Sequence, residues 1–267
     1  MLLCCGAEGL LEYRLAWQTL SCPLPVPSLM ACSGTHRAIL DNTEHLLCLN
    51  DSLMNVDPGA ECLLLWQDRP LVLSGETNAV TLLDPTSGTP LFLAPAGLYP
   101  QDMCFLPDDI LAVCGGHAGT VLLLHLPELQ PLAQIPLPGL PQRLTHQGRW
   151  LYVLCATEEF LPQSLLCRVN LRNAQTEVLQ TFPGLPGALY ADGRSLWICA
   201  GEGLYRLRPG ERHAHRRLSG LGLVRHIAGK GRDLLLSDPV QGKLLLVRPH
   251  QPSQVLMEGD VGQTRYL

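Results

Sequence analysis

Apolar and polar positions alternate in short blocks that repeat along the chain. Each block is an apolar run, a small residue, a tight polar turn and a second apolar run, as in LAVCGGHAGTVLLL at 111–124 and LWICAGEGLYRL at 196–207. Short apolar runs bounded by turn residues are typical of buried β-strands. The pattern therefore predicts paired strands, with further copies of the block at 2–13, 38–49, 71–83, 151–169 and 234–247.

The small residue before each turn gives the period of the repeat. After the paired strands come a third, weaker apolar run, such as EVLQTFP at 177–183, and a Gly/Pro corner that leads to a short fourth run. A period of about 40 residues with four strands per unit is typical of a β-propeller blade. We therefore predict an all-β fold, a seven-bladed β-propeller of four-stranded antiparallel blades. The seven anchor residues, 33 to 44 positions apart, are Cys5, Asp41, Ser74, Cys114, Cys155, Cys199 and Ser237.

The two ends of the chain complement each other. If the four strands of a blade are called A to D, with the corner before A and the anchor at the end of B, the chain starts on a B strand and ends on an A strand. We expect the C-terminal strand to close the ring by completing the N-terminal blade, which removes two exposed sheet edges. One domain, 1–267, then has its first blade shared by 1–24 and 259–267. Six blades or an open solenoid are the alternatives.

The corner and turn motifs carry a family resemblance. Gly184–Pro186, Asp192–Gly193, Leu196–Cys199 and Asp84–Gly88 follow the rhythm of corner, turn, apolar strand and second turn. In this respect the chain resembles the YncE-like and quinoprotein-type β-propellers. The resemblance implies a propeller fold and leaves the activity open, because propellers serve unrelated functions.

Composition narrows the class of protein. Hydrophobic residues make up 46% and charged residues 16%, as in a globular chain with a large core, and the net charge of −5 argues against a nucleic-acid surface. No apolar run approaches the roughly 20 residues that span a bilayer. Most of the eleven cysteines lie in apolar strands, so we interpret them as buried thiols in a reducing compartment. With no signal-peptide pattern at the N-terminus, we expect a cytoplasmic protein without membrane partners.

The candidate binding residues occupy equivalent repeat positions. The turn after strand B has an acidic or imidazole side chain three residues past the anchor in five of the seven repeats, and the corner strands add polar residues. We expect these side chains to gather at one mouth of the central channel and to bind a protein partner or a small polar ligand. The set is Glu8, Glu44, His117, Glu158, Glu202, Asp102, Arg143, Arg225 and Arg265.

Several alternatives accompany this interpretation. Turns are polar also because water solvates them, and converging carboxylates suit a hard cation such as Ca²⁺. Cysteine anchors lack the paired spacings of zinc sites, so we expect no metal site and no cofactor. The basic run Arg212–Arg217 is a solvated hairpin tip or an anion or metal site, and Phe160 and Leu161 form a lid or are buried against a neighbouring turn.

No catalytic motif is present, so we assign no catalytic residue and predict a non-enzymatic binding module. The alternative is a propeller hydrolase of the lactonase kind, metal-assisted or not, with its site in the channel mouth.

Overall fold

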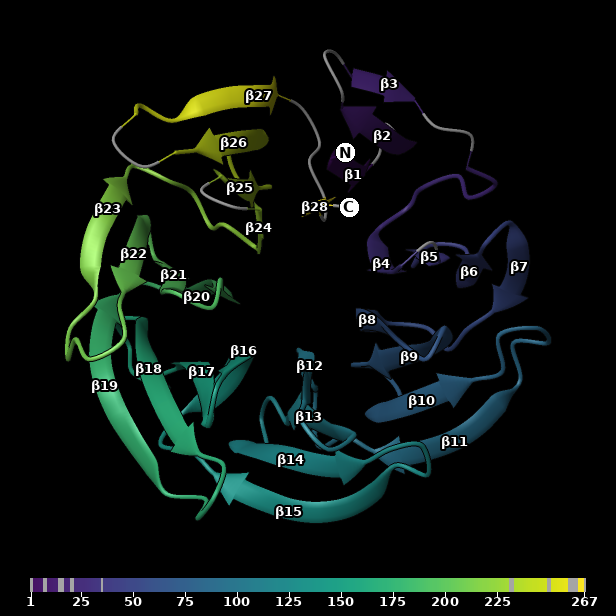
Figure 1. The fold of residues 1–267 in the computed structure, drawn as a ribbon, viewed down its shortest axis with the longest axis horizontal. Coiled ribbons are helices and arrows are strands. Elements are labelled where there is room, and N and C mark those ends of the chain that lie inside the picture. The colour runs from purple at the N-terminus through teal and green to yellow at the C-terminus, as the bar shows by residue number, and fades with distance from the viewer. Residues whose placement is uncertain are drawn as a thin grey trace. The chain divides into compact units, whose positions relative to one another are not determined.

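The computed structural model contains only β-strands as regular secondary structure within its described residues (Figure 1). It describes residues 22–34, 36–230, 233–248 and 251–258 with their side chains, and the backbone of strands at 2–6, 9–13, 17–19 and 264–266. In these ranges there is no helix long and apolar enough to cross a membrane.

The chain divides into two compact units, Ala96–His226 and the combination of Met1–Pro95 with Ile227–Leu267. The unit Ala96–His226, called unit 2 below, has three four-stranded sheets, each in chain order. The first contains β12 (Met103–Leu106), β13 (Ile110–Cys114), β14 (Thr120–His125) and β15 (Gln130–Pro136). The second contains β16 (Leu140–Gln147), β17 (Trp150–Ala156), β18 (Gln163–Asn170) and β19 (Thr176–Pro183). The third contains β20 (Pro186–Ala191), β21 (Leu196–Ala200), β22 (Gly203–Leu207) and β23 (His215–Ser219).

Unit 1, the other unit, repeats this arrangement in three sheets with described side chains. One contains β4 (Leu29–Ser33), β5 (His36–Asp41), β6 (Leu46–Leu49) and β7 (Ser52–Asn55). Another contains β8 (Ala60–Trp66), β9 (Arg69–Ser74), β10 (Ala79–Leu83) and β11 (Pro90–Pro95). The last contains β24 (His226–Lys230), β25 (Asp233–Asp238), β26 (Lys243–Val247) and β27 (Gln254–Glu258).

Each sheet is an antiparallel meander, as the short turns predict. In the sheet of β16 to β19, Val153 on β17 lies opposite Leu144 on β16 and Cys167 on β18. The strand faces bury their apolar side chains against the neighbouring sheet, so that Val153 and Cys155 share one core with Val121 and Ile135. The sheets therefore pack face to face as blades, with the core between them.

The predicted number of blades has to be corrected. Six sheets are described with their side chains, and the structure supports a propeller with six such blades in place of the seven equivalent blades expected. The remaining strands, β1 (Leu2–Gly6), β2 (Gly9–Tyr13), β3 (Trp17–Thr19) and β28 (Thr264–Tyr266), are described only through their backbone pairing, in the order β28-β1-β2-β3. The two outer strands of this sheet, β3 and β28, have three residues each, so they form only short ladders of hydrogen bonds. The two central apolar runs of this copy match those of the other repeats, so the sequence pattern predicts a blade equivalent to the others.

The two ends of the chain are joined in this short sheet. β28 pairs antiparallel with β1, with Tyr266 opposite Leu2 and Thr264 opposite Cys4. This pairing between the C-terminal and the first strand agrees with the expected completion of the N-terminal sheet.

Polar anchor residues fasten the start of each turn to the incoming corner. The fully buried Asp41 accepts hydrogen bonds from the N–H of Val26 at 2.8 Å and, across its own turn, from the N–H of Thr43 at 2.9 Å. Ser74 donates to the carbonyl of Pro58 at 2.6 Å and accepts from the N–H of Thr77 at 3.0 Å. The anchors are therefore more than small packing residues: where they are polar, they bond two loops together.

Other repeats have a cysteine, which is less polar, at the anchor position. Cys114, Cys155 and Cys199 are buried thiols that form no disulfide, and the sulfur of Cys155 lies 4.0 Å from that of Cys167. The hydrogen bond to Cys167 and then burial raise the pKa of the Cys155 thiol, which keeps it protonated. Their burial agrees with the interpretation of these cysteines as buried thiols.

Candidate functional site

In unit 2, the corners and the turns after the second strands contact one another at one end of the strands. The N–H of His117 donates to the carbonyl of Leu98 at 2.9 Å, and the N–H of Gly201 donates to that of Leu185, also at 2.9 Å. The N–H of Gly184 binds the carbonyl of Pro162 at 2.9 Å. Turns and corners thus form one continuous layer, which we call the corner–turn surface: residues 97–102, 115–119, 137–143, 157–163, 183–185, 201–202 and 220–225.

Glycines allow this layer to be tight. Gly201 has a φ of 52°, in the left-handed region, and a Cβ on it would clash with the carbonyl oxygen of Pro183 and lie 3.4 Å from the Cα of Gly184. The two backbones therefore touch, and only glycine meets both the dihedral and the steric demand. Such a contact fixes the position of the loops next to it.

The longest turn of the corner–turn surface, residues 157–163, is closed at its base. The N–H of Thr157 donates to the carbonyl of Gln163 at 3.0 Å, and the N–H of Gln163 donates to the Thr157 hydroxyl at 3.3 Å. The buried Ser164 hydroxyl donates to the carbonyl of Gly184 at 2.7 Å, which ties the turn to the next corner.

The tip of this turn presents apolar side chains to solvent. Phe160 is 100% exposed and Leu161 70% exposed. The interpretation that they are buried against a neighbouring turn is therefore wrong. Glu158 and Glu159, also exposed, precede them directly, so the tip combines two carboxylates with an aromatic ring and an aliphatic chain.

The corners add exposed apolar residues that sequence reasoning missed. Leu98, Tyr99 and Leu185 are each about half exposed, at 51%, 53% and 50%. The Tyr99 ring lies against that of His117, with centroids 5.4 Å apart. A signal for them is present in the sequence, because leucine follows glycine in each of the corners Gly97–Leu98, Gly139–Leu140, Gly184–Leu185 and Gly220–Leu221.

The predicted turn residues keep their common register. His117, Glu158 and Glu202 lie in the turns between the second and third strands of the three sheets of unit 2, and all three are exposed. Glu44 has the same position and exposure in unit 1, between β5 and β6.

The predicted corner residues Asp102 and Arg143 are half-buried and lie together. Asp102 accepts a hydrogen bond from the N–H of Leu144 at 3.0 Å, which joins β12 to β16. Arg143 donates to the carbonyl of Gln142 at 2.7 Å and to that of Gln101, beside Asp102 on the neighbouring blade, at 3.5 Å. These bonds give both residues a part in holding the first strands of neighbouring blades.

The other predicted residues are placed less fully. Arg225 is half-buried and directly precedes β24. Glu8 lies outside the described residues, and Arg265 is described only as a position of β28 opposite Leu3. Among the described residues, no group of three or more His, Cys, Asp or Glu side chains could hold a metal ion.

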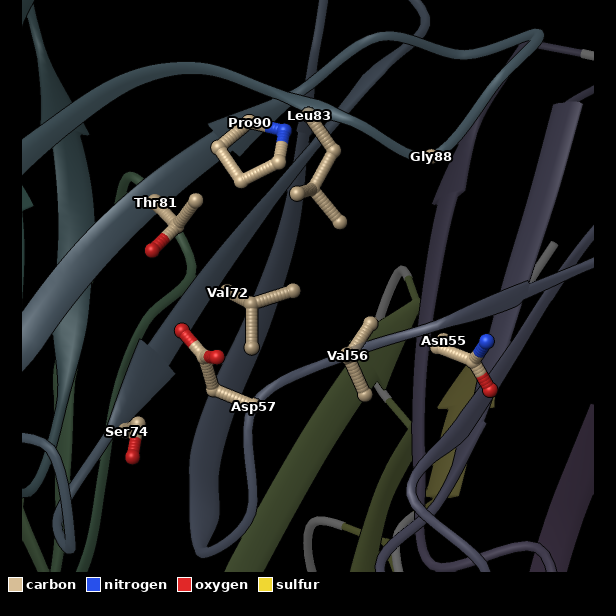
Figure 2. Close-up of a pocket in the computed structure, with 9 residues that line it drawn as sticks. All are labelled: Asn55, Val56, Asp57, Val72, Ser74, Thr81, Leu83, Gly88 and Pro90. Atoms are coloured by element: carbon tan, nitrogen blue, oxygen red, sulfur yellow. The ribbon is translucent and has the colours of Figure 1, made fainter.

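Unit 1 has a small pocket between the sheet of β4 to β7 and the sheet of β8 to β11. Figure 2 shows the oxygen-bearing side chains of Asp57, Ser74 and Thr81 along one side of it, with Val56 and Val72 beside them. Its volume is about 200 Å³. Ligand pockets usually measure about 300–1,000 Å³. We therefore interpret this pocket as a gap in inter-blade packing.

Comparison with known proteins establishes the fold. No family model matches the sequence, and no curated protein matches it. Among solved structures, a streptogramin B lyase superimposes with a TM-score of 0.72 at 13% identity, covering 92% of this chain and 89% of the lyase. Hydrazine synthase of Kuenenia stuttgartiensis gives 0.70 at 13% identity, covering 89% and 80%.

BamB from Moraxella catarrhalis also superimposes, with a TM-score of 0.64 at 12% identity, covering 98% of this chain and 84% of BamB. These proteins are β-propellers, and the chain is an all-β β-propeller. At such low identities the likeness concerns the fold alone.

Proposed function

We propose that the protein is a non-enzymatic interaction module that binds a protein partner through the corner–turn surface of unit 2. The observation that carries the proposal is the turn 157–163, where a fully exposed Phe160 and a largely exposed Leu161 stand on a base closed by hydrogen bonds. An aromatic side chain held on a rigid frame loses little conformational entropy on binding, and aromatic residues are enriched in protein interfaces.

The composition of the surface suggests the chemistry of the partner. Glu158 and Glu159 directly precede the apolar tip, and Leu185 lies on the corner that is bonded to the same turn. A complementary partner has an apolar pocket for Phe160 and Leu161 with lysine or arginine residues on its rim. In this arrangement the apolar tip supplies most of the affinity, and the carboxylates raise the association rate.

The experiment places a photo-crosslinking amino acid at position 160 and, as a matched control, at Leu132, an exposed residue of the outer strand β15. We expect adducts with one protein from position 160 and none from position 132, and we expect the soluble peptide TEEFLPQ, residues 157–163, to compete. The adduct is identified by mass spectrometry and its binding is measured with pure proteins.

In that measurement, Phe160→Ala should weaken binding at least tenfold, whereas Leu132→Ala should change it less than twofold. Glu158→Gln with Glu159→Gln should lower the association rate and its dependence on salt. Equal adducts from positions 160 and 132, or unchanged affinity of Phe160→Ala, would contradict the proposal. The alternative of a hydrolase or lactonase-like enzyme stays a prediction that no observation on the corner–turn surface favours.

A further inference from the structure

A larger pocket lies at the opposite end of the strands of unit 2, between the sheet of β16 to β19 and the sheet of β20 to β23. Its volume is about 330 Å³, and it is bounded by the turn at Gly148 and Arg149 on one blade and the turn 208–210 on the next. These turns join first to second and third to fourth strands, so they face away from the corner–turn surface. The volume is sufficient for a small ligand.

The lining of this pocket is cationic. Arg149, Arg168 and Arg208 line it, and no Asp or Glu does. Arg168 is ion-paired with Glu177. Within the described part of the chain, the guanidinium groups of Arg149 and Arg208 have no carboxylate partner.

Neighbouring residues extend the positive charge. Burial first, and then Arg208 and Arg217, lower the pKa of the Arg206 guanidinium, while Asp192 and Glu211 act in the opposite direction. Arg208 and Arg217 therefore place positive charge near Arg206 on this side of the blade. Two carboxylates lie nearby and are hydrogen-bonded to other donors: Asp192 accepts from Trp197 at 2.9 Å, and Glu211 accepts from the backbone N–H of Arg208 at 2.9 Å.

Trp150 orients two of the arginines. The guanidinium carbons of Arg149 and Arg168 lie 4.8 and 4.1 Å from the centroid of its ring. A guanidinium held over an aromatic face keeps its N–H edge available for a planar pair of acceptor oxygens. The pocket thus has donors set in place before a ligand arrives, beside the apolar residues Leu196, Leu207 and Pro209.

We propose that this pocket binds a phosphate ester, with its oxygens on Arg149 and Arg208 and its organic group against Leu196 and Leu207. The two guanidinium groups of Arg149 and Arg208, which have no carboxylate partner in the ranges that the structure describes, match a dianion better than a single carboxylate. The apolar side favours an ester over free phosphate. The ester is either a small molecule or a phosphorylated side chain of another protein, and both present the same phosphate group to the arginines.

The test measures binding to the full chain by calorimetry at low salt, with inorganic phosphate, phenyl phosphate and a phosphotyrosine peptide as probes. We expect saturable binding of phenyl phosphate that is at least threefold tighter than that of inorganic phosphate. A peptide that binds more than tenfold tighter than phenyl phosphate identifies a phosphorylated protein as the source, and equal affinities identify a small ester.

The combination of Arg149→Gln and Arg208→Gln should weaken phenyl phosphate binding at least tenfold. The matched control is Arg172→Gln, an exposed arginine in the turn between β18 and β19 at the same end of the strands but outside the pocket, and it should change binding less than twofold. Lysine at positions 149 and 208 keeps the charge and loses the paired donors, so it should give an intermediate loss and serves if the glutamine variant unfolds.

Absence of saturable phenyl phosphate binding would overturn the proposal. An equal loss in the control and in the double variant would also overturn it, because it would indicate a general effect of net charge.

Discussion

The close approach of the Gly201 and Pro183 backbones allows the loss of stability of a Gly201 variant to be predicted. Replacing Gly201 with alanine puts a Cβ against the carbonyl oxygen of Pro183 and forces a residue with a side chain to adopt a φ of 52°. The left-handed conformation costs an L-residue about 1–2 kcal/mol. Overpacking a close contact adds roughly 1–3 kcal/mol.

Gly148 provides a matched control in the same unit. Its φ is 62°, and a Cβ there would meet nothing within 4 Å. Gly148→Ala therefore has only the conformational cost of about 1–2 kcal/mol. The difference between the two variants isolates the contact between turn and corner.

The assay is equilibrium unfolding in urea, followed by circular dichroism, together with the melting temperature. For a chain of this size, 1 kcal/mol corresponds to about 2–4 °C. We expect Gly201→Ala to lower the melting temperature by roughly 4–20 °C and Gly148→Ala by roughly 2–8 °C, with the larger loss for Gly201→Ala. Equal effects of the two substitutions would refute the reasoning, because the turn and the corner would then not be in contact.

Three further predictions concern the framework. Asp41→Ala, which leaves the N–H groups of Val26 and Thr43 without their acceptor, should lower the free energy of unfolding by about 2–4 kcal/mol in urea titrations, and Asp41→Asn should lower it less. Deleting residues 264–266 removes the partner of β1 and should cause aggregation detectable by light scattering; a stable monomer would contradict this role. Because burial raises the pKa of the Cys48 thiol above 9.0 in the folded protein, the unfolded thiol ionises first, so stability should fall as pH rises above about 9, less steeply in Cys48→Ala.

Much of the fold could be predicted from the pattern of apolar runs. The anchors Asp41 and Cys114 do end second strands, and the turns after them hold Glu44 and His117 at the predicted position. This succeeds because a strand buried on both faces leaves an unbroken apolar run that a turn must interrupt. The blade count was less accessible, since periodicity does not report the length of the edge strands that complete a sheet.

The candidate sites were harder to predict because they depend on exposure and on contacts between blades. Polar residues such as Asp102 have the same appearance in the sequence whether they face a ligand or bond the next blade, as Asp102 does with Leu144. Phe160 was recognised as unusual, but its exposure could not be derived from its neighbours in the chain. The pocket at Arg149 and Arg208 combines residues from two blades, and no spacing rule connects them.

The hydrogen bonds between Thr157 and Gln163 also bear on how the protein tolerates change. They close the turn below its tip, so residues 158–162 can lengthen, shorten or be exchanged while the ladder of β17 and β18 stays intact. Loop closure becomes only slightly less favourable as a loop grows, by about 0.6 kcal/mol for each doubling of its length. The turn is therefore an insertion point where natural divergence or a grafted peptide can change what the blade recognises without a new fold.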